Sequence, residues 1–211
     1  MFQLDNVQVK NVFTIKSLLL KEPVISIEGQ SGSGKSTLLR LLNNLDDPAA
    51  GIIKLNSRNI TELPACELRR KVVMAPQNPV MFDGSIRENL YMGLRLSGQQ
   101  AASDEALKEM LDRLRLEKSL DININDLSGG EKQRIALGRV LLMKQANVLL
   151  LDEPTSELDN KTTDHVLSQF LTIARKHEQQ VIMVTHDKHV SEKFADNVIN
   201  MDTYSGQHGG E

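Results

Sequence analysis

The sequence contains no tryptophan, a single cysteine and few aromatic residues, and each scarcity argues against a class of protein. Aromatic residues make up 3% of the 211 positions, too few for a platform that stacks on single-stranded nucleic acid. Cys66 has no cysteine to pair with inside the chain, which is typical of proteins in reducing compartments. The formal net charge of −3, from 25 basic and 28 acidic residues, argues against a strongly basic nucleic-acid groove, although it is compatible with a local patch.

Long hydrophobic runs are also missing. The longest apolar stretches, such as 148–151 and 181–184, have the length of strands and fall far short of the roughly 20 residues that span a bilayer. Residues 1–5 have no basic head followed by an apolar core, so we expect no signal peptide. We therefore predict a soluble, cytoplasmic protein that reaches a membrane only through a partner.

Short apolar runs bounded by turn residues recur along the chain and predict strands buried on both faces of a parallel sheet. These runs cover residues 24–28, 72–76, 148–151, 181–185 and 198–201. Helical patterns lie between them, at 35–44 and 160–177. The alternation of strands and helices indicates an α/β fold.

Two regions depart from this alternation. Residues 2–20 alternate apolar and polar positions, which predicts antiparallel strands, and 52–55 resembles another short strand. Residues 79–145 contain no convincing strand, and Ser103 is predicted to cap a helix over 104–116. We expect one domain, 1–211, made of an α/β core, a helical subdomain and a mobile tail: 1–78 with 146–204, 79–145, and 205–211.

Residues 29–37 match the phosphate-loop pattern G-x-x-x-x-G-K-[ST], between a predicted strand and a predicted helix. The glycines allow the backbone to wrap around phosphates, and the helix N-terminus adds its positive dipole end. Lys35 is predicted to reach the β- and γ-phosphates, and the Ser36 hydroxyl to ligate Mg²⁺. A serine- and glycine-rich turn that only caps a helix is the alternative, and the flanking strand counts against it. The predicted nucleotide-binding residues here are Gly29, Gln30, Ser31, Gly32, Ser33, Gly34, Lys35, Ser36 and Thr37.

A second candidate lies at the end of the strand 148–151, where Asp152 and Glu153 follow four apolar residues. The carboxyl ends of parallel strands form the ligand-binding edge of such a sheet. Asp152 suits a contact to Mg²⁺, and Glu153 can polarise an attacking water. Taken alone, an acidic pair at a solvated strand end is an equally good interpretation, and the upstream phosphate loop favours the functional one.

The third candidate is the stretch 127–134, in which Ser128 can cap a helix and Gly129 and Gly130 expose backbone N–H groups. By itself this pattern indicates only a capped helix or a second anion site.

Together, these stretches resemble the motifs of ATP-binding cassette (ABC) ATPases. Residues 127–131 are similar to the family signature, and the other motifs occur in the family's order from residue 29 to residue 187, so the resemblance covers essentially the whole chain. Gln77 resembles the Q-loop glutamine, Asp159 the acidic D-loop position and His186 the switch histidine. The resemblance implies a P-loop NTPase core of parallel strands with an N-terminal antiparallel β subdomain and an inserted helical subdomain.

The resemblance also implies a mechanism that uses ATP and Mg²⁺. Two copies would pair head to tail, so that ATP on the phosphate loop of one copy is capped by the signature of the other. Glu153 would orient or deprotonate the water, and His186 would hydrogen-bond the γ-phosphate, so we predict hydrolysis; closing needs ATP and opening follows hydrolysis. The residues expected from the partner copy are Ser128, Gly129 and Gly130, and the expected Mg²⁺ ligands are Ser36, Gln77 and Asp152.

The sequence departs from the family pattern at two places. In the family an aromatic side chain upstream of the phosphate loop stacks on adenine, and Phe2 and Phe13 are the nearest aromatics without standing in a clear family context. Gly138 and Val140 replace small alanines that usually follow the signature, which we expect to alter helix packing more than chemistry.

An ATPase without a spanning helix implies a separate transmembrane permease at the inner face of the cell membrane. Residues 82–90 resemble the segment after the Q-loop in exporter-type cassettes, so we predict an exporter subunit, with bacterial metal (iron) export systems as the nearest resemblance. Two alternatives stay open: an ATPase that regulates an envelope machine without moving a solute, and a soluble cassette acting on ribosomes or DNA. We expect no nucleic-acid partner, because tandem cassettes and strong basic patches are not visible. A small-molecule P-loop kinase is disfavoured because it does not need the element 128–130.

Overall fold

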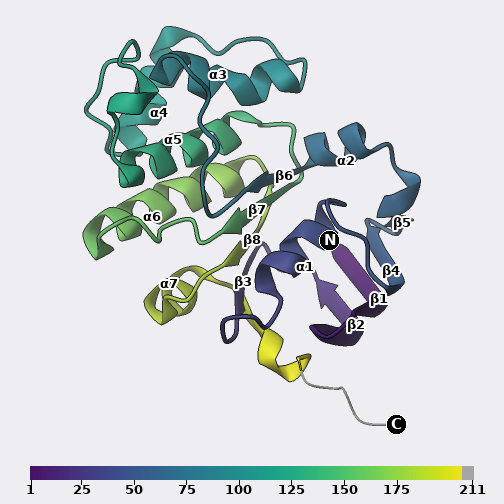
Figure 1. Cartoon of the computed structure of the whole chain (residues 1–211). Coiled ribbons are helices and arrows are strands. Elements are labelled where there is room, and N and C mark those ends of the chain that lie inside the picture. The colour runs from purple at the N-terminus through teal and green to yellow at the C-terminus, as the bar shows by residue number, and fades with distance from the viewer. Residues whose placement is uncertain (206–211) are drawn as a thin grey trace.

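A computed structural model describes residues 1–205, and its strands form two sheets (Figure 1). Five parallel strands make the larger sheet, in the order β6-β7-β8-β3-β9, and four antiparallel strands make the smaller one, in the order β2-β1-β4-β5. The predicted α/β fold with an antiparallel N-terminal sheet is confirmed. Of the predicted tail 205–211, residues 206–211 lie outside the described residues.

The strands are β1 (Phe2–Val9), β2 (Phe13–Leu20), β3 (Val24–Glu28), β4 (Ala50–Leu55), β5 (Arg58–Asn59), β6 (Val72–Ala75), β7 (Val148–Asp152), β8 (Gln180–Val184) and β9 (Asn197–Asn200). The α-helices are α1 (Lys35–Leu42), α2 (Ala65–Lys71), α3 (Ile86–Leu96), α4 (Asp104–Arg113), α5 (Gly129–Leu142), α6 (Asn160–Lys176) and α7 (Lys188–Phe194). Short 3₁₀ turns cover Ile60–Glu62, Ile124–Asp126 and Met201–Thr203.

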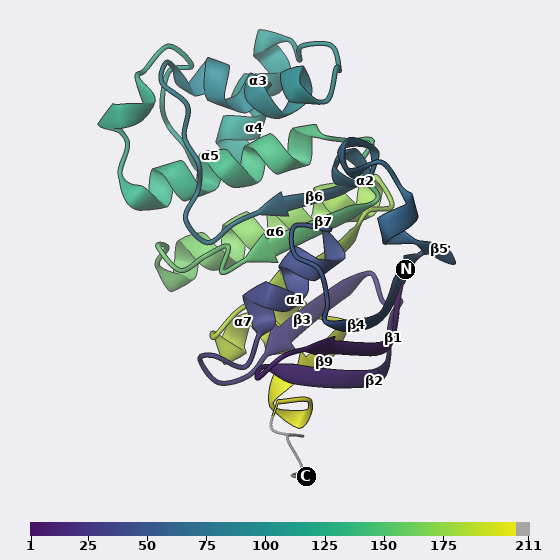
Figure 2. The ribbon, with the colours of Figure 1, turned by 45° about the vertical axis from the view of Figure 1, so that its right-hand side comes forward.

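The parallel strands are apolar at almost every position because both faces of their sheet are covered. In β7, Leu149 and Leu151 belong to a core shared with the helices α3–α6. Val148 and Leu150 belong to a second core shared with α1 and the antiparallel sheet. Figures 1 and 2 show the same arrangement, with α1 between the two sheets and α3–α5 gathered on the opposite side. This packing brings the carboxyl ends of β3, β7 and β8 to one edge.

Most of the predicted elements end within one or two residues of the observed ones, and the largest difference is three residues. The helices predicted at 35–44 and 104–116 end at Leu42 and Arg113. Soon after each end a residue has a positive φ, +49° at Asn44 and +53° at Arg115, and the left-handed conformation cannot continue a right-handed helix. The last predicted strand, 198–201, is shifted by one residue to Asn197–Asn200.

Helix α5 forms the centre of the helical region, because α3 and α4 both pack on it at Gly138. A Cβ added there would lie 2.9 Å from Leu114 Cδ1 and 3.1 Å from Leu90 Cδ2. The absence of a side chain at Gly138 thus lets the three helices approach closely. The helix predicted after Ser103 begins as expected, since the Ser103 hydroxyl accepts a hydrogen bond from Ala106 N. None of the helices in residues 1–205 has the length and apolarity needed to cross a bilayer.

Candidate functional site

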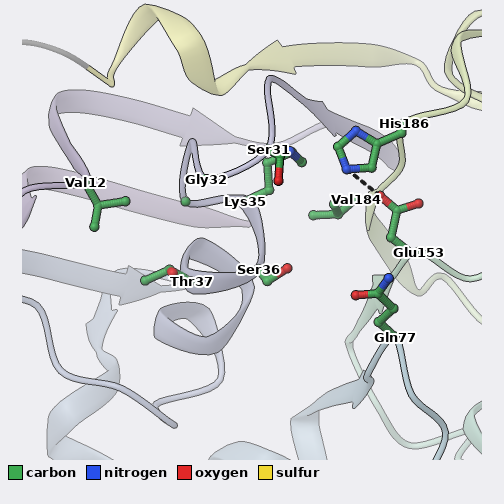
Figure 3. A pocket seen from close by; sticks show the side chains of 11 residues that line it. Val12, Ser31, Gly32, Lys35, Ser36, Thr37, Gln77, Glu153, Val184 and His186 are labelled. Carbon is green, nitrogen blue, oxygen red and sulfur yellow. Dashed lines mark ion pairs between the residues drawn. The ribbon is translucent and has the colours of Figure 1, made fainter.

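A cavity of about 390 Å³ opens at the edge where β3, β7 and β8 end (Figure 3). It joins the phosphate loop to Gln77, Glu153 and His186, which come from three distant parts of the chain. They meet because each follows a strand of the same parallel sheet, and such strands present their following loops at one edge. The lining residues are Val12, Ser31, Gly32, Gly34, Lys35, Ser36, Thr37, Gln77, Glu153, Val184 and His186.

Lys35 is folded back over the phosphate loop. Its Nζ donates to Gly29 O at 2.7 Å and to Gln30 O at 2.8 Å. An ammonium group has three protons to donate, so one remains for an anion in the cavity. Gly29 and Gln30 themselves line a neighbouring cavity of about 340 Å³. Ser33 is buried, and its Oγ finds no hydrogen-bond partner among residues 1–205.

Gly34 is required by the packing of the loop. Its φ is +90°, and an added Cβ would lie 2.6 Å from Phe13 Cδ1 and 2.7 Å from Val12 Cγ1. Only glycine combines this backbone conformation with so close a neighbour. The loop is therefore held against the antiparallel sheet while its inner face stays open.

Ser36 and Asp152 bring together oxygen atoms of the kind that a hard cation binds. Ser36 and Gln77 line the cavity, and the Ser36 hydroxyl donates to Asp152 Oδ1 at 3.0 Å. Burial raises the pKa of Asp152, and the hydrogen bond from Ser36 opposes that rise. Within the described residues no cluster of three or more His, Cys, Asp or Glu side chains forms a closed metal site. The donor set fits Mg²⁺, which takes few protein ligands and completes its shell with water and phosphate oxygens.

Glu153 and His186 lie next to each other at one end of the cavity (Figure 3). His186 Nε2 lies 3.3 Å from Glu153 Oε1, and the side chains are 58% and 12% exposed respectively. Burial raises the pKa of Glu153, while the nearby imidazole opposes the rise. A carboxylate shielded in this way is a suitable base for a water molecule in the cavity.

The backbone of Glu153 adopts a strained conformation, with a φ of +49°. Such a value is uncommon for a residue with a side chain and persists only where the surroundings hold it. Glu153 N donates to Val184 O at 3.0 Å, which ties this residue to β8. The geometry turns the residue out of the line of β7.

The signature residues lie outside the cavity. Ser128 caps α5: its Oγ accepts from Glu131 N at 3.3 Å, and Glu131 Oε2 accepts from Ser128 N at 2.9 Å. A Cβ at Gly130 would lie only 2.7 Å from Glu157 O, so the first turn of α5 rests directly on the segment after Glu153. The cap uses the N–H of Glu131, whereas the N–H groups of Gly129 and Gly130 have no partner within the helix and remain available to a ligand.

Asp159 also lies outside the cavity and serves as the cap of α6. Its Oδ1 accepts from the backbone N–H groups of Lys161 and Thr162, and its Oδ2 accepts from the Thr162 hydroxyl at 2.6 Å. The hydrogen bond from Thr162 is the main cause of the lowered pKa of this carboxyl.

Neither aromatic candidate for adenine contacts the cavity. Phe2 and Phe13 are fully buried in the core beneath the antiparallel sheet. Val12, which precedes Phe13, lines the cavity instead, at the end opposite His186 (Figure 3).

Sequence reasoning missed Gln133, the buried neighbour of Glu153. Its Nε2 donates to Glu153 O at 2.8 Å, although Gln133 belongs to α5 and is 20 residues away in the sequence. The only signal in the sequence is a glutamine inside the stretch 127–134, where the helical pattern does not reveal which polar side chain is buried.

Comparison with known proteins adds independent findings. Residues 15–156 match the profile of the family described as ABC transporter. The chain is 35% identical over 185 residues to the methionine import ATP-binding protein MetN of Staphylococcus haemolyticus, covering 85% of this chain and 54% of that protein. It is 39% identical over 173 residues to the lipoprotein-releasing system ATP-binding protein LolD of Rickettsia conorii, covering 81% of this chain and 77% of that protein.

A solved structure of a bacterial Atm1-family ABC exporter with ATP bound is also similar. The TM-score is 0.82 at 27% sequence identity, and the similarity covers 95% of this chain and 37% of that chain. The chain spans about half the length of the methionine-import relative, 54% of it.

Proposed function

Because the chain belongs to the ABC transporter family and is similar to its ATP-binding proteins, we propose that it binds ATP with Mg²⁺ and hydrolyses it to power a membrane transporter. One observation carries the proposal: a single cavity joins the phosphate loop to Glu153 and His186. Phosphate-binding groups and a base thus meet in one place, as hydrolysis requires.

In this proposal the phosphate loop binds the triphosphate through its backbone N–H groups and Lys35. The third proton of the Lys35 ammonium, which is not donated to Gly29 O or Gln30 O, would bind the β- and γ-phosphates, and the N-terminus of α1 favours negative charge at the same place. Gly29, Gln30, Ser31, Gly32, Ser33, Gly34, Ser36 and Thr37 complete the loop.

Ser36, Gln77 and Asp152 would hold Mg²⁺. When bound, this ion neutralises phosphate charge and orients the oxygens for in-line attack. Asp152 accepts a hydrogen bond from the Ser36 hydroxyl, and this bond keeps the oxygen atoms of both side chains at the same edge of the sheet.

Glu153 would accept a proton from the attacking water, and His186 would donate a hydrogen bond to the γ-phosphate. The 3.3 Å contact between the two side chains places both at one end of the cavity. His186 is more than half exposed, so its ring is free to turn from Glu153 to the phosphate.

We further propose that two copies pair head to tail. Ser128, Gly129 and Gly130 offer a helix N-terminus outside the cavity of their own chain, which supports a role at the nucleotide of a second copy. Asp159 would contribute to that contact by capping α6 beside it. Residues 79–145 would act as a helical subdomain on a core formed by 1–78 and 146–204.

The partner in the membrane would be a permease that docks on the segment after Gln77 and holds the chain at the inner face of the membrane. The similar proteins are named for methionine import, for lipoprotein release and for export, so they support transport without supporting the predicted export direction. Metal export likewise stays a prediction.

The test is ATP turnover by the whole chain and by two variants. Glu153→Gln is expected to abolish hydrolysis and, with ATP and Mg²⁺, to accumulate as a dimer in size-exclusion chromatography, because binding persists while the base is lost. Ser128→Arg is expected to lose hydrolysis with little loss of ATP affinity, because the residue acts on the other copy. Full turnover in Glu153→Gln would contradict the assignment of the base, and full turnover in Ser128→Arg would contradict the head-to-tail pairing.

The permease is tested by co-purification from a mild detergent extract, where a ribosome or a DNA complex would contradict the transport role.

A further inference from the structure

The side chain of Gln133 bridges helix α5 and the turn that contains Glu153. It is 4% exposed, and its Nε2 donates to Glu153 O at 2.8 Å and to Ser156 Oγ at 3.2 Å. Its Oε1 accepts from Glu157 N at 3.0 Å. Both polar atoms of this buried amide are therefore directed at one turn, 153–157.

The turn needs a support from outside. Glu153 has a φ of +49°, a conformation that persists only when neighbouring groups over-determine it. Within the turn, Glu153 O accepts only from Ser156, through its N at 3.3 Å and its Oγ at 3.2 Å. The bond from Gln133 is shorter than both and comes from a separate element.

The same face of α5 carries the signature glycines. Gln133 follows Gly129 by four residues and Gly130 by three, and residues at these separations lie side by side on a helix. Cβ atoms at Gly129 and Gly130 would lie 2.9 Å from Glu157 Oε2 and 2.7 Å from Glu157 O. The first turns of α5 and the turn 153–157 are thus in direct contact along one helix face.

We propose that Gln133 is a positioning residue for hydrolysis. It fixes the backbone of Glu153 to α5, so that the position of the first turn of α5 sets the direction of the Glu153 carboxylate. The inference rests on the proposed function, in which Glu153 serves the nucleotide of its own chain and Ser128–Gly130 the nucleotide of a second copy. Gln133 then links the two half-sites that one chain contributes. A base that moves relative to its water loses rate rather than substrate affinity.

Gln179 offers a matched control. It is 2% exposed, and its Nε2 also donates to two acceptors, Met143 O at 3.1 Å and Ala146 O at 3.0 Å, away from the cavity. Methionine replaces glutamine in both places with an unbranched side chain of similar length that cannot donate. Any general cost of losing a buried amide is therefore present in both variants.

The experiment compares the full chain with Gln133→Met and Gln179→Met. It measures the melting temperature, kcat and KM for ATP, and ATP affinity in the Glu153→Gln background, where no turnover interferes. We expect Gln133→Met to lower kcat about 10- to 100-fold while ATP affinity changes less than about 3-fold. Gln179→Met is expected to lower the melting temperature by a smaller amount, because it loses two hydrogen bonds and its Oε1 has no partner among residues 1–205, and to keep kcat within about 2-fold of wild type. An unchanged kcat in Gln133→Met, or an equal loss in Gln179→Met, would overturn the inference.

A second variant keeps the inference testable if Gln133→Met does not fold. Ser156 is exposed, and its hydroxyl is the other side-chain donor to Glu153 O. Ser156→Ala is expected to lower kcat about 3-fold or more with unchanged ATP affinity, and a wild-type kcat would overturn the inference. The wild-type chain is assayed beside the variants: if it does not hydrolyse ATP, the proposed function fails, whereas active wild type with equally active Gln133→Met defeats only the role of Gln133.

Discussion

Replacing Arg139 by methionine is expected to destabilise the fold far more than breaking the best-formed ion pair on the surface. Arg139 lies in α5 and donates to Val80 O at 2.7 Å, to Asn89 O at 2.8 Å and to Asn89 Oδ1 at 3.0 Å. Its guanidinium also stacks on the Phe82 ring, with Cζ 5.1 Å from the ring centroid. Among residues 1–205 no carboxylate forms an ion pair with it, and burial lowers the pKa of this guanidinium to about 10.

The expected cost follows from these contacts. A hydrogen bond from a charged donor contributes roughly 1.5–3 kcal/mol, and three are lost together. Methionine offsets part of this cost because it removes a charge from a poorly solvated place. The expected net decrease in the free energy of unfolding is about 3 kcal/mol. The segment 80–89 loses its tie to α5 at the same time.

The assay is urea-induced unfolding followed by circular dichroism, with Arg40→Met as control. Arg40 forms a two-pronged pair with Asp46, at 2.7 and 2.8 Å, but both side chains are well exposed. Exposed pairs contribute little even with good geometry, so Arg40→Met is expected to unfold almost like wild type. The reasoning is that burial, rather than charge pairing, decides how much an arginine contributes to the free energy of unfolding. A decrease of that free energy below about 1 kcal/mol in Arg139→Met, or an equal decrease in both variants, would refute it.

Two further predictions concern the site. Because burial raises the pKa of Glu153 above its ordinary 4.5, the folded state buries a charge at neutral pH. Glu153→Gln should therefore have a higher free energy of unfolding than wild type near pH 8, and this difference should shrink as the pH falls towards 4.5 and the Glu153 carboxylate becomes protonated in the folded state. A difference in the free energy of unfolding that stays constant from pH 8 down to pH 4.5 would contradict this. Gly34→Ala should lower ATP affinity more than about tenfold, since its φ of +90° and the 2.6 Å approach to Phe13 force the loop to move. Gly98→Ala is the control, with a φ of +72° and open space around it, and equal affinities of the two variants in equilibrium ATP binding would count against the steric argument.

Much of the fold could be predicted because its signals are local. Continuous apolar runs identified the parallel strands, and alternation identified the antiparallel ones. Boundaries were less accessible: α1 and α4 end earlier than their apolar patterns, at places where the next residues turn to positive φ. That turn depends on packing against other elements, which periodicity does not contain.

The candidate site divides in the same way. The phosphate loop and the pair Asp152–Glu153 stand out in sequence because their chemistry requires particular residues at a fixed spacing. The sequence did not identify a residue that would stack on adenine: Phe2 and Phe13, the nearest aromatics, are buried, while the inconspicuous Val12 lines the cavity. Burial is a property of the assembled layers.

By itself, then, the sequence determined the α/β class, the strand edge where the site lies and the residue types that bind phosphate, because each of these depends on short-range spacing and on the shared direction of parallel strands. Only the tertiary structure decided which distant side chains touch. It set His186 3.3 Å from Glu153, and it directed the buried amide of Gln133 at the Glu153 carbonyl. Contacts between residues far apart in the chain follow from how the helices pack on the sheet, and that packing is the joint result of many side chains rather than of any motif.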